Sequence, residues 1–306
     1  MDLRKGLDSM KYKVAIIGAD GFMGRHLIDA FVDDYDIETI RIGRNPDDDH
    51  YLELTCPNEF DYGVLEGINI IIFLAAVVNQ DRCAKEFDYC WNVMVEGTSV
   101  FIENSIERGC KVLFFSSDTV YDYNPRIIYS ESSPTNPITA YGKMKNEVEK
   151  RFEHHMGGFK SVRLSYVVSR DDKFVSYCLK CIEKEIKADV FHPFYRNCIT
   201  MNDVTNMVRW FIMNWDSYPF SYLNLVGDES ISRVRIVDEI NRLYGDCLDY
   251  NIVFPGQDFF ANRCRMMHIR SEYLNDFRII EKKSFVEKLS IELDGALCNY
   301  KNKGAK

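Results

Sequence analysis

A glycine-rich turn near the beginning of the chain constrains the fold more than any other feature. The segment reads Gly-Ala-Asp-Gly-Phe-Met-Gly over residues 18–24, directly after the apolar run 13–17 and at the start of the amphipathic stretch 24–32. Glycines at this spacing let the backbone turn sharply and approach a phosphate, and the N–H groups at the start of a helix favour an anion. A turn of this kind between a strand and a helix predicts a dinucleotide pyrophosphate site, whereas the alternative is a plain tight connection.

Apolar runs in the first half of the chain predict an α/β fold with a doubly wound parallel sheet. Buried strands are expected at residues 13–17, 38–42, 70–74, 111–115 and 161–165. Helical patterns separate them, including one long helix over 84–107, and strands covered by helices on both faces form parallel sheets.

The alternation of strand and helix patterns becomes less regular after about residue 168, which predicts two domains. We expect residues 1–168 to form a Rossmann domain, completed by a strand and a helix from about 196–226. Residues 169–306 are expected to form a smaller C-terminal substrate-binding lobe. In this half of the chain we expect Asp203 and Ser232 to be the N-caps of two helices.

Composition excludes several classes of function. The 306 residues carry a net charge of −9, which argues against a nucleic-acid partner because such proteins need a basic surface. No apolar run is long enough to span a membrane, and the polar first residues lack the apolar core of a signal peptide, so we expect a cytoplasmic protein. The ten cysteines are then expected to be reduced thiols, and Cys178 and Cys181 to be packing residues rather than metal ligands; no metal site is expected.

A tyrosine and a lysine four residues apart, Tyr141 and Lys145, are the strongest candidates for chemistry. Four residues is about one helical turn, and we expect a helix that starts at Asn136-Pro137 to set both on one face. A phenol alone holds its proton until about pH 10, and a cation one turn away is expected to lower that pKa. Ser117 follows the strand 111–115, at the sheet edge where active sites gather. The alternative is a surface Tyr/Lys pair on an amphipathic helix.

The order of these motifs resembles the extended short-chain dehydrogenase/reductase family, whose members act mostly on nucleotide sugars. The resemblance covers about residues 13–240 and implies that Ser117, Tyr141 and Lys145 are the catalytic set. It also implies a nicotinamide dinucleotide held by a larger set of residues. This set comprises Gly18, Asp20, Gly21, Phe22, Met23, Gly24, Arg44, Leu74, Ala75, Ala76, Asn92, Ser116, Tyr141, Lys145 and Val167.

Arg44 bears on the choice of cofactor. A carboxylate at the end of the second strand would bind the adenosine ribose and favour NAD(H), but Arg44 follows this strand instead. Its guanidinium is placed to meet a 2′-phosphate, so NADP(H) is favoured and NAD(H) remains possible. An exposed loop arginine is the alternative.

The segment 116–122 separates the branches of the family. Nucleotide-sugar dehydratases have an Asp-Glu pair here for loss of water, and Thr119 stands in place of the glutamate beside Asp118. The segment resembles that of the dTDP-4-dehydrorhamnose reductases, in which Asp122 has a counterpart. That resemblance implies reduction of the 4-keto group of a nucleotide-linked 6-deoxy sugar. The substrate contacts it implies are Asn79, Asp118, Thr119 and Arg196, with Arg263 and Arg265 as weaker candidates.

Two other functions stay open for this sequence. An epimerase uses the same three residues and keeps NAD tightly bound, and a non-catalytic regulatory protein could use the dinucleotide as a ligand. Relatives often form homodimers through helices equivalent to residues 84–107 and 141–155, so a homodimer is possible.

Overall fold

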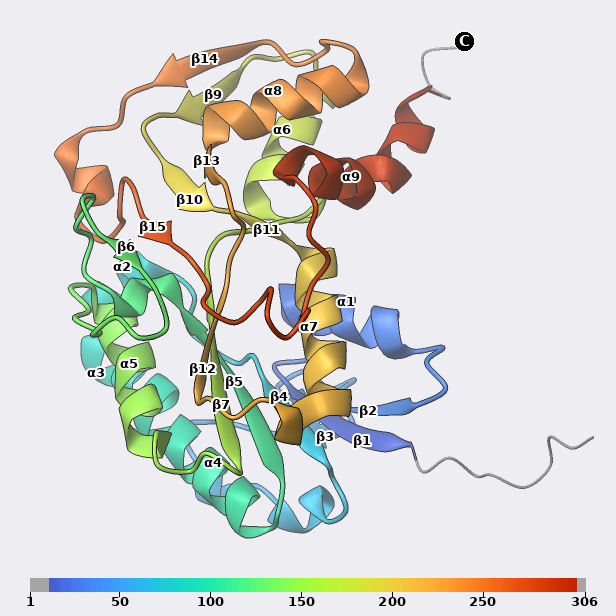
Figure 1. The fold of residues 1–306 in the computed structure, drawn as a ribbon, viewed down its shortest axis with the longest axis vertical. Coiled ribbons are helices and arrows are strands. Elements are labelled where there is room, and N and C mark those ends of the chain that lie inside the picture. The colour runs from blue at the N-terminus through green and yellow to red at the C-terminus, as the bar shows by residue number, and fades with distance from the viewer. Residues whose placement is uncertain (1–10, 302–306) are drawn as a thin grey trace, which may run out of the picture.

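A parallel sheet of seven strands forms the centre of the molecule. The computed structural model describes residues 11–301, and side chains as far as residue 293. Residues 1–10 of the first predicted domain and 302–306 of the second lie outside the described residues. The sheet order is β12-β7-β5-β4-β1-β2-β3, and every neighbouring pair is parallel (Figure 1). The strands are β1 (Tyr12–Ile17), β2 (Ile37–Gly43), β3 (His50–Tyr51), β4 (Ile70–Phe73), β5 (Lys111–Ser117), β7 (Phe159–Leu164) and β12 (Tyr222–Leu225). The doubly wound α/β prediction is therefore confirmed.

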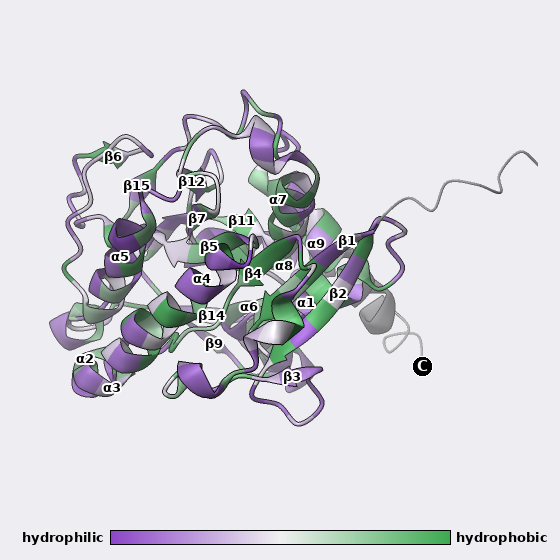
Figure 2. Cartoon of the chain, turned by 90° about the horizontal axis from the view of Figure 1, so that it is seen from below, coloured by the Kyte–Doolittle hydropathy of each residue, from purple (hydrophilic) through white to green (hydrophobic). Residues whose placement is uncertain are grey.

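Helices cover both faces of this sheet. Helices α1 (Phe22–Phe31) and α7 (Met201–Asn214) lie on one face, and α4 (Thr98–Glu107) and α5 (Ala140–Phe152) lie on the other (Figure 1). Alternate residues of β1 serve the two cores, because Ile16 packs toward α1 and α7 while Ile17 packs toward α4 and α5. In Figure 2 the strands β1 and β4 are green between the helices, whereas the outer faces of α4 and α5 are largely purple.

The long helix expected over residues 84–107 is confirmed from Phe87 to Glu107, but it contains a π-helical stretch and a break at Glu86 precedes it. The chain forms α2 (Gln80–Lys85), α3 (Phe87–Trp91), a π-helical turn η3 (Asn92–Gly97) and then α4. A Cβ atom on Gly97 would lie 1.7 Å from the Leu54 carbonyl oxygen, so this turn packs directly against the backbone after β3. Wide turns of this kind occur frequently at functional sites.

Two helix starts also differ from expectation. Helix α5 begins at Ala140 rather than at Asn136-Pro137, because the Thr139 hydroxyl accepts a hydrogen bond from the Gly142 N–H at 3.1 Å. Helix α7 is capped by Thr200, and Asp203 is its partner in a capping box rather than the N-cap itself. Ser232 caps α8 (Arg233–Tyr244) as predicted.

The second half of the chain adds a smaller lobe above the carboxyl ends of the strands. It contains α6 (Lys173–Glu183), α8 and α9 (Phe285–Lys301), and Cys178 and Cys181 are buried in its core (Figure 1). Short strand pairs complete it: β8 (Val167–Val168) with β11 (Ile199–Thr200), β9 (Ala188–Phe191) with β14 (Tyr250–Val253), β10 (Tyr195–Asn197) with β13 (Ser230–Ser232), and β6 (Ile128–Tyr129) with β15 (His268–Ile269). Within residues 11–301, none of the helices combines the length and apolar character that crossing a membrane requires.

A close backbone contact seats the start of α5 on the turn that follows β5. A Cβ atom on Gly142 would lie 2.1 Å from the Thr119 carbonyl oxygen, far closer than a carbon and an oxygen that are not bonded to each other can pack. Glycine is therefore required here for close packing rather than for an unusual φ. The contact fixes the helix that carries Tyr141 against the strand end that carries Ser117.

We expect the substitution Gly142→Ala to lower the free energy of unfolding by about 1–3 kcal/mol, because the new methyl group must displace this backbone. Urea unfolding monitored by circular dichroism would measure the change. Gly157→Ala is the matched control, because no atom lies within 4 Å of a Cβ built there. Equal stability of the two variants would contradict the proposed packing constraint.

Candidate active site

A cavity of about 1100 Å³ opens at the carboxyl ends of β1 and β4, where the order of the sheet reverses. Open α/β sheets bind ligands at this point. Gly18 has φ of +86°, and a Cβ on it would lie 3.0 Å from the Ala75 N atom, so the turn after β1 packs tightly against the turn after β4. A Cβ on Gly24 would lie 2.4 Å from the Gly18 carbonyl oxygen. The glycines thus bring bare backbone to the cavity wall.

The N-terminus of α1 faces this cavity. Its N-cap is Gly21, and no described side chain caps the helix, which leaves N–H groups of the first turn available to a ligand. These groups and the helix dipole favour an anion such as a pyrophosphate. Bare backbone, an uncapped helix start and a large cavity fit a dinucleotide.

Most predicted cofactor residues line the cavity. These are Gly18, Asp20, Gly21, Phe22, Met23, Gly24, Arg44, Leu74, Ala75, Ala76 and Val167. Asn92 does not, because it is exposed on the π-helical turn, and the wide turn places Val93 in the wall instead. Ser116 is buried, and its hydroxyl has no hydrogen-bond partner among the described residues.

The second half of the chain supplies wall residues that the sequence interpretation missed. These are Tyr166, Asp171, Asp172, Lys173, Phe174 and Arg233. Tyr166 lies in the segment 165–168, which resembles the part of the family that passes the nicotinamide, and Phe174 begins the helix expected over 174–186, but neither side chain was singled out. Arg233 follows the predicted cap Ser232, and this is the one signal that could have drawn attention to it.

Arg44 lies at the rim of the cavity, one residue after β2. Its guanidinium is 3.7 Å from the Glu53 carboxylate, and its side chain is 66% exposed. The acidic run that follows turns back on its own loop, because Asp48 accepts a hydrogen bond from the Asn45 N–H at 3.1 Å and Asp49 accepts one from the Arg41 N–H at 2.8 Å. The arginine therefore remains accessible to a ligand in the cavity.

Tyr141 and Lys145 lie on one face of α5, as predicted, beside the end of β5. The Lys145 Nζ donates to the Phe115 carbonyl oxygen at 2.7 Å and lies 5.9 Å from the centre of the Tyr141 ring. Tyr141 packs against the same buried cluster as Ala76 and Val77, two residues of the cavity wall. The shared cluster thus places this pair near the cavity wall.

Ser117 ends β5 on the same side. Its hydroxyl accepts a hydrogen bond from the Thr119 N–H and donates one to the Asp118 carboxylate, each at 3.2 Å. The serine is only partly buried, so its hydroxyl can exchange the Asp118 bond for one to a ligand.

Burial dominates the ionisation of this pair. Desolvation raises the pKa of Tyr141, and Cys83 and Asp118 act in the same direction. Desolvation also lowers the pKa of Lys145 to about 7, partly offset by Glu149 and Cys83. The expectation of a lowered Tyr141 pKa is therefore wrong for this structure, because burial outweighs the effect of the neighbouring lysine, whose Nζ bonds to the Phe115 carbonyl. At neutral pH Tyr141 is protonated and can act as a proton donor.

The predicted substrate residues fall into different environments. Asp118 is buried, and desolvation raises its pKa although Arg196 opposes the shift from 3.8 Å. Thr119 is buried with a hydroxyl that lacks a partner among the described residues. Asn79 is exposed and caps α2 by accepting the Arg82 N–H. The weaker candidates are Arg263, which pairs with Asp81, and Arg265, whose guanidinium lies 4.5 Å from the centre of the Phe260 ring.

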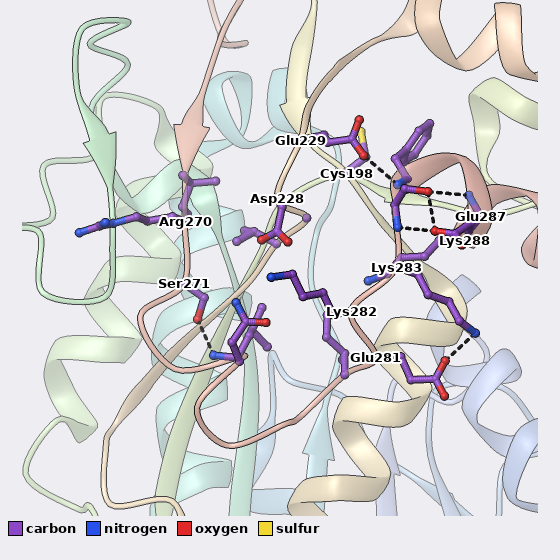
Figure 3. A pocket seen from close by; sticks show the side chains of 18 residues that line it. Cys198, Asp228, Glu229, Arg270, Ser271, Glu281, Lys282, Lys283, Glu287 and Lys288 are labelled. Atoms are coloured by element: carbon purple, nitrogen blue, oxygen red, sulfur yellow. Dashed lines mark hydrogen bonds and ion pairs between the residues drawn. The ribbon is translucent and has the colours of Figure 1, made fainter.

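A second cavity, of about 520 Å³, lies between the strand end Val226–Gly227 and the start of α9. Its charged groups mostly bind one another or the helix start: Lys283 pairs with Glu281, and Glu229 accepts the Phe285 N–H (Figure 3). Lys288 in turn pairs with Asp203 at 2.9 Å. No predicted site residue lines this cavity, and its polar contacts hold α9 in place.

The depressed pKa of Lys145 predicts a pH dependence of stability. Its folded pKa of about 7 lies below the ordinary value of 10.5, so between these pH values the unfolded chain binds more protons than the folded one. The contribution of Lys145 therefore makes the free energy of unfolding rise with pH across this window. We expect Lys145→Met to reduce that rise, measured by urea unfolding at about pH 7 and about pH 9.5. Lys143→Met, on the exposed face of α5, is the control, and equal slopes in both variants would contradict a lowered Lys145 pKa.

Comparisons with known proteins find relatives that match about half of this chain. A dTDP-4-dehydrorhamnose reductase from Aggregatibacter actinomycetemcomitans is 28% identical over 141 residues, which is 45% of this chain and 46% of that protein. Methionine adenosyltransferase 2 subunit beta from Danio rerio is 25% identical over 165 residues, 53% of this chain and 50% of that protein. The chain thus spans about half the length of the curated relatives it matches.

Solved structures share the fold over nearly the whole chain. The structure of dTDP-4-dehydrorhamnose reductase from Bacillus anthracis, in complex with NADP, superposes with a TM-score of 0.79 at 20% identity, covering 94% of this chain and 100% of that one. The family described as RmlD substrate binding domain matches residues 12–246, from the start of β1 to just beyond α8. The protein therefore belongs to the RmlD substrate binding domain family.

Proposed function

We propose that this protein is an NADPH-dependent oxidoreductase that reduces the 4-keto group of a nucleotide-linked 6-deoxy sugar. The observation that carries the proposal is the position of Ser117, Tyr141 and Lys145 beside a glycine-lined cavity at the reversal of the sheet order. Membership of the RmlD substrate binding domain family and the similarity to a dTDP-4-dehydrorhamnose reductase support it.

The cavity walls fit the cofactor in two places. The turn over residues 18–24 and the start of α1 would hold the pyrophosphate, and Arg44 would bind the 2′-phosphate of NADPH. When bound, the reduced nicotinamide supplies a hydride to the carbonyl carbon.

Tyr141 then supplies the proton. Its raised pKa keeps the phenol protonated, so it can transfer a proton to the carbonyl oxygen as that oxygen gains charge. The Ser117 hydroxyl donates a hydrogen bond to the same oxygen. The Lys145 ammonium stabilises the phenolate that remains, and its bond to the Phe115 carbonyl keeps it in position.

The segment after Ser117 favours reduction over dehydration. Loss of water needs a proton acceptor and a proton donor across the C5–C6 bond. Asp118 is buried and bonded to Ser117 and Ser165, and Thr119 has a hydroxyl that cannot act as a base at neutral pH. Neither residue supports removal of a carbon-bound proton.

A screen of NADPH oxidation tests the proposed activity. The substrates are 4-keto-6-deoxy sugars carrying dTDP, GDP, CDP or UDP, and at least one should be reduced with stoichiometric loss of NADPH absorbance. Tyr141→Phe should lower kcat about 10²- to 10⁴-fold, because the proton donor is lost, with the NADPH dissociation constant nearly unchanged. Tyr35→Phe, at an 87% exposed tyrosine, should keep full activity.

The same screen separates the other two functions. Conversion of a sugar without net loss of NADPH, together with copurified oxidised cofactor, would identify an epimerase. Binding of NADPH without turnover on any substrate would identify a regulatory protein. Either result contradicts the proposed reduction, as would full activity of the Tyr141→Phe variant.

Arg44→Ala tests the choice of cofactor. Loss of the guanidinium should weaken NADPH binding about tenfold or more, because a charged contact to the 2′-phosphate is lost, whereas NADH binding should change little. Fluorescence titration with each cofactor measures both dissociation constants. An unchanged ratio of the two constants would remove Arg44 as the reason for any NADPH preference.

A further inference from the structure

Residues 254–263 form a strap that leaves the C-terminal lobe and returns to it. The strap follows β14 and runs down the left side of the molecule toward α2 (Figure 1). After it the chain rejoins the lobe beside β10, where the Tyr195 N–H donates to the Arg265 carbonyl oxygen at 2.9 Å. None of the residues in the strap is buried, and Phe254 is 72% exposed. A segment that buries so little surface opens at a low cost in free energy.

One carboxylate outside the strap holds it in place. Asp81, in the first turn of α2, accepts hydrogen bonds from both terminal nitrogens of the Arg263 guanidinium, of which the Nη1 bond is 3.2 Å long. Asp81 also accepts the side-chain amide of Asn262 at 3.1 Å, and the Arg263 Nη1 donates to the Phe259 carbonyl oxygen at 3.1 Å. Among the described residues, no other side-chain hydrogen bond or ion pair joins the strap to the rest of the protein. The Asp81–Arg263 pair is therefore the latch of the strap.

The strap connects the elements that carry the predicted substrate contacts. Asn79 is the N-cap of α2, two residues before the latch. Arg196 donates to the carbonyl oxygen of Cys264, the residue directly after the strap, at 2.8 Å. Cys264 packs in the same buried cluster as Val120, in the turn 118–120 that follows Ser117. The strap thus reaches from α2 to the end of β5, across the substrate side of the site.

This side of the site is closed. Asp118 and Thr119 are only 6% and 5% exposed, and neither lines the cofactor cavity. Ser117 and Tyr141 are partly exposed, and they do not line that cavity either. A sugar nucleotide reaches the Ser117 hydroxyl only after a covering segment has moved. Helix α5 is fixed on the sheet by buried contacts, whereas the strap is held by a single carboxylate, so the strap is the segment that can move.

We propose that the strap is a lid over the substrate side of the site, and that release of the Asp81–Arg263 latch admits the substrate. The inference rests on the proposed function, which places a sugar nucleotide on this side. It gives Arg263 a partner in the closed protein instead of a contact with the substrate.

The Cys264 thiol is a built-in reporter of opening. It is 4% exposed, and burial raises its pKa to about 11, so N-ethylmaleimide should modify it only when the lid is open. Arg263→Met and Asp81→Asn should each raise the rate of modification about tenfold, because charged hydrogen bonds of the closed state are lost. Arg263→Lys should give a smaller rise, since a lysine keeps the charge without the fork. Mass spectrometry of the peptide that contains Cys264, after timed quenching, measures each rate.

Arg235→Met is the matched control, because it removes an arginine of the same lobe that is 51% exposed and paired with Glu239. It should leave the Cys264 rate at the wild-type value. Cys178, buried in the core of the lobe, reports on unfolding of the lobe itself, and its modification should stay slow in every variant.

Protection by ligands tests what the lid covers. The glucose conjugates of dTDP, GDP, CDP and UDP lack the keto group, so they can bind without being reduced. With NADPH present, at least one of them should slow the modification of Cys264 in Arg263→Met, because it occupies the space under the lid. NADPH alone should not slow it, because no residue of the strap lines the cofactor cavity.

Four results would overturn the proposal: an unchanged Cys264 rate in both latch variants, a parallel rise at Cys178, protection by NADPH alone, or protection by none of the four sugar nucleotides. These measurements are independent of turnover. Faster modification in the latch variants that a sugar nucleotide suppresses, combined with no NADPH oxidation in the screen, would uphold the lid and refute the reductase.

Discussion

The contact between the start of α5 and the turn after β5 is the constraint on which the candidate site depends. Gly142 brings the helix backbone against the Thr119 carbonyl, and one turn later Lys145 bonds to the Phe115 carbonyl of β5. A further turn along, Glu149 forms a buried ion pair with Arg163 of β7 at 2.8 Å. The helix is therefore held on the sheet at three successive turns, and the side chains between them have little freedom to move.

The buried ion pair of Glu149 and Arg163 shows why moving α5 on the sheet would cost much free energy. Glu149 and Arg163 are both almost fully buried, and Ser161 and Tyr121 complete their hydrogen bonds. Removing one member of such a pair leaves an uncompensated charge, which typically destabilises by about 3–5 kcal/mol. The same environment that holds α5 in place also determines the ionisation of Lys145, because burial removes the water that would solvate its ammonium.

Sequence reasoning predicted the fold because each local pattern agreed with the global one. The runs 13–17, 70–74 and 111–115 are apolar on both faces, which only a covered parallel sheet accommodates, and they became β1, β4 and β5. The glycine-rich turn over residues 18–24 was also predictable, because few other functions require glycines at this spacing between a strand and a helix. What the sequence did not predict were the helix starts and the π-helical stretch over residues 92–97, where Gly97 packs against the Leu54 carbonyl oxygen.

The site was predictable in its members but not in their electrostatics. The spacing of Tyr141 and Lys145 predicts that they share a helix face, yet it carries no information on depth. Burial raises the pKa of Tyr141 and lowers that of Lys145. Tyr141 therefore keeps its proton instead of losing it. For a reduction this is the useful state, because the developing alkoxide needs a donor at the moment the hydride arrives.

The two arginines around Phe194, Arg196 and Arg233, carry this argument one step further. In the sequence, the family resemblance implies Arg196 as a substrate contact, and no motif marks Arg233. The structure distinguishes them by what their donors already do: those of Arg196 serve two carbonyl oxygens and a buried carboxylate, whereas those of Arg233 serve no described residue. A guanidinium that is desolvated and unpaired is unfavourable until an anion reaches it, so its cost in the free protein becomes selectivity when the ligand binds. A guanidinium at a cavity wall whose Nε lacks a partner among the described residues is therefore a stronger candidate for an anion contact than one whose donors are already bonded.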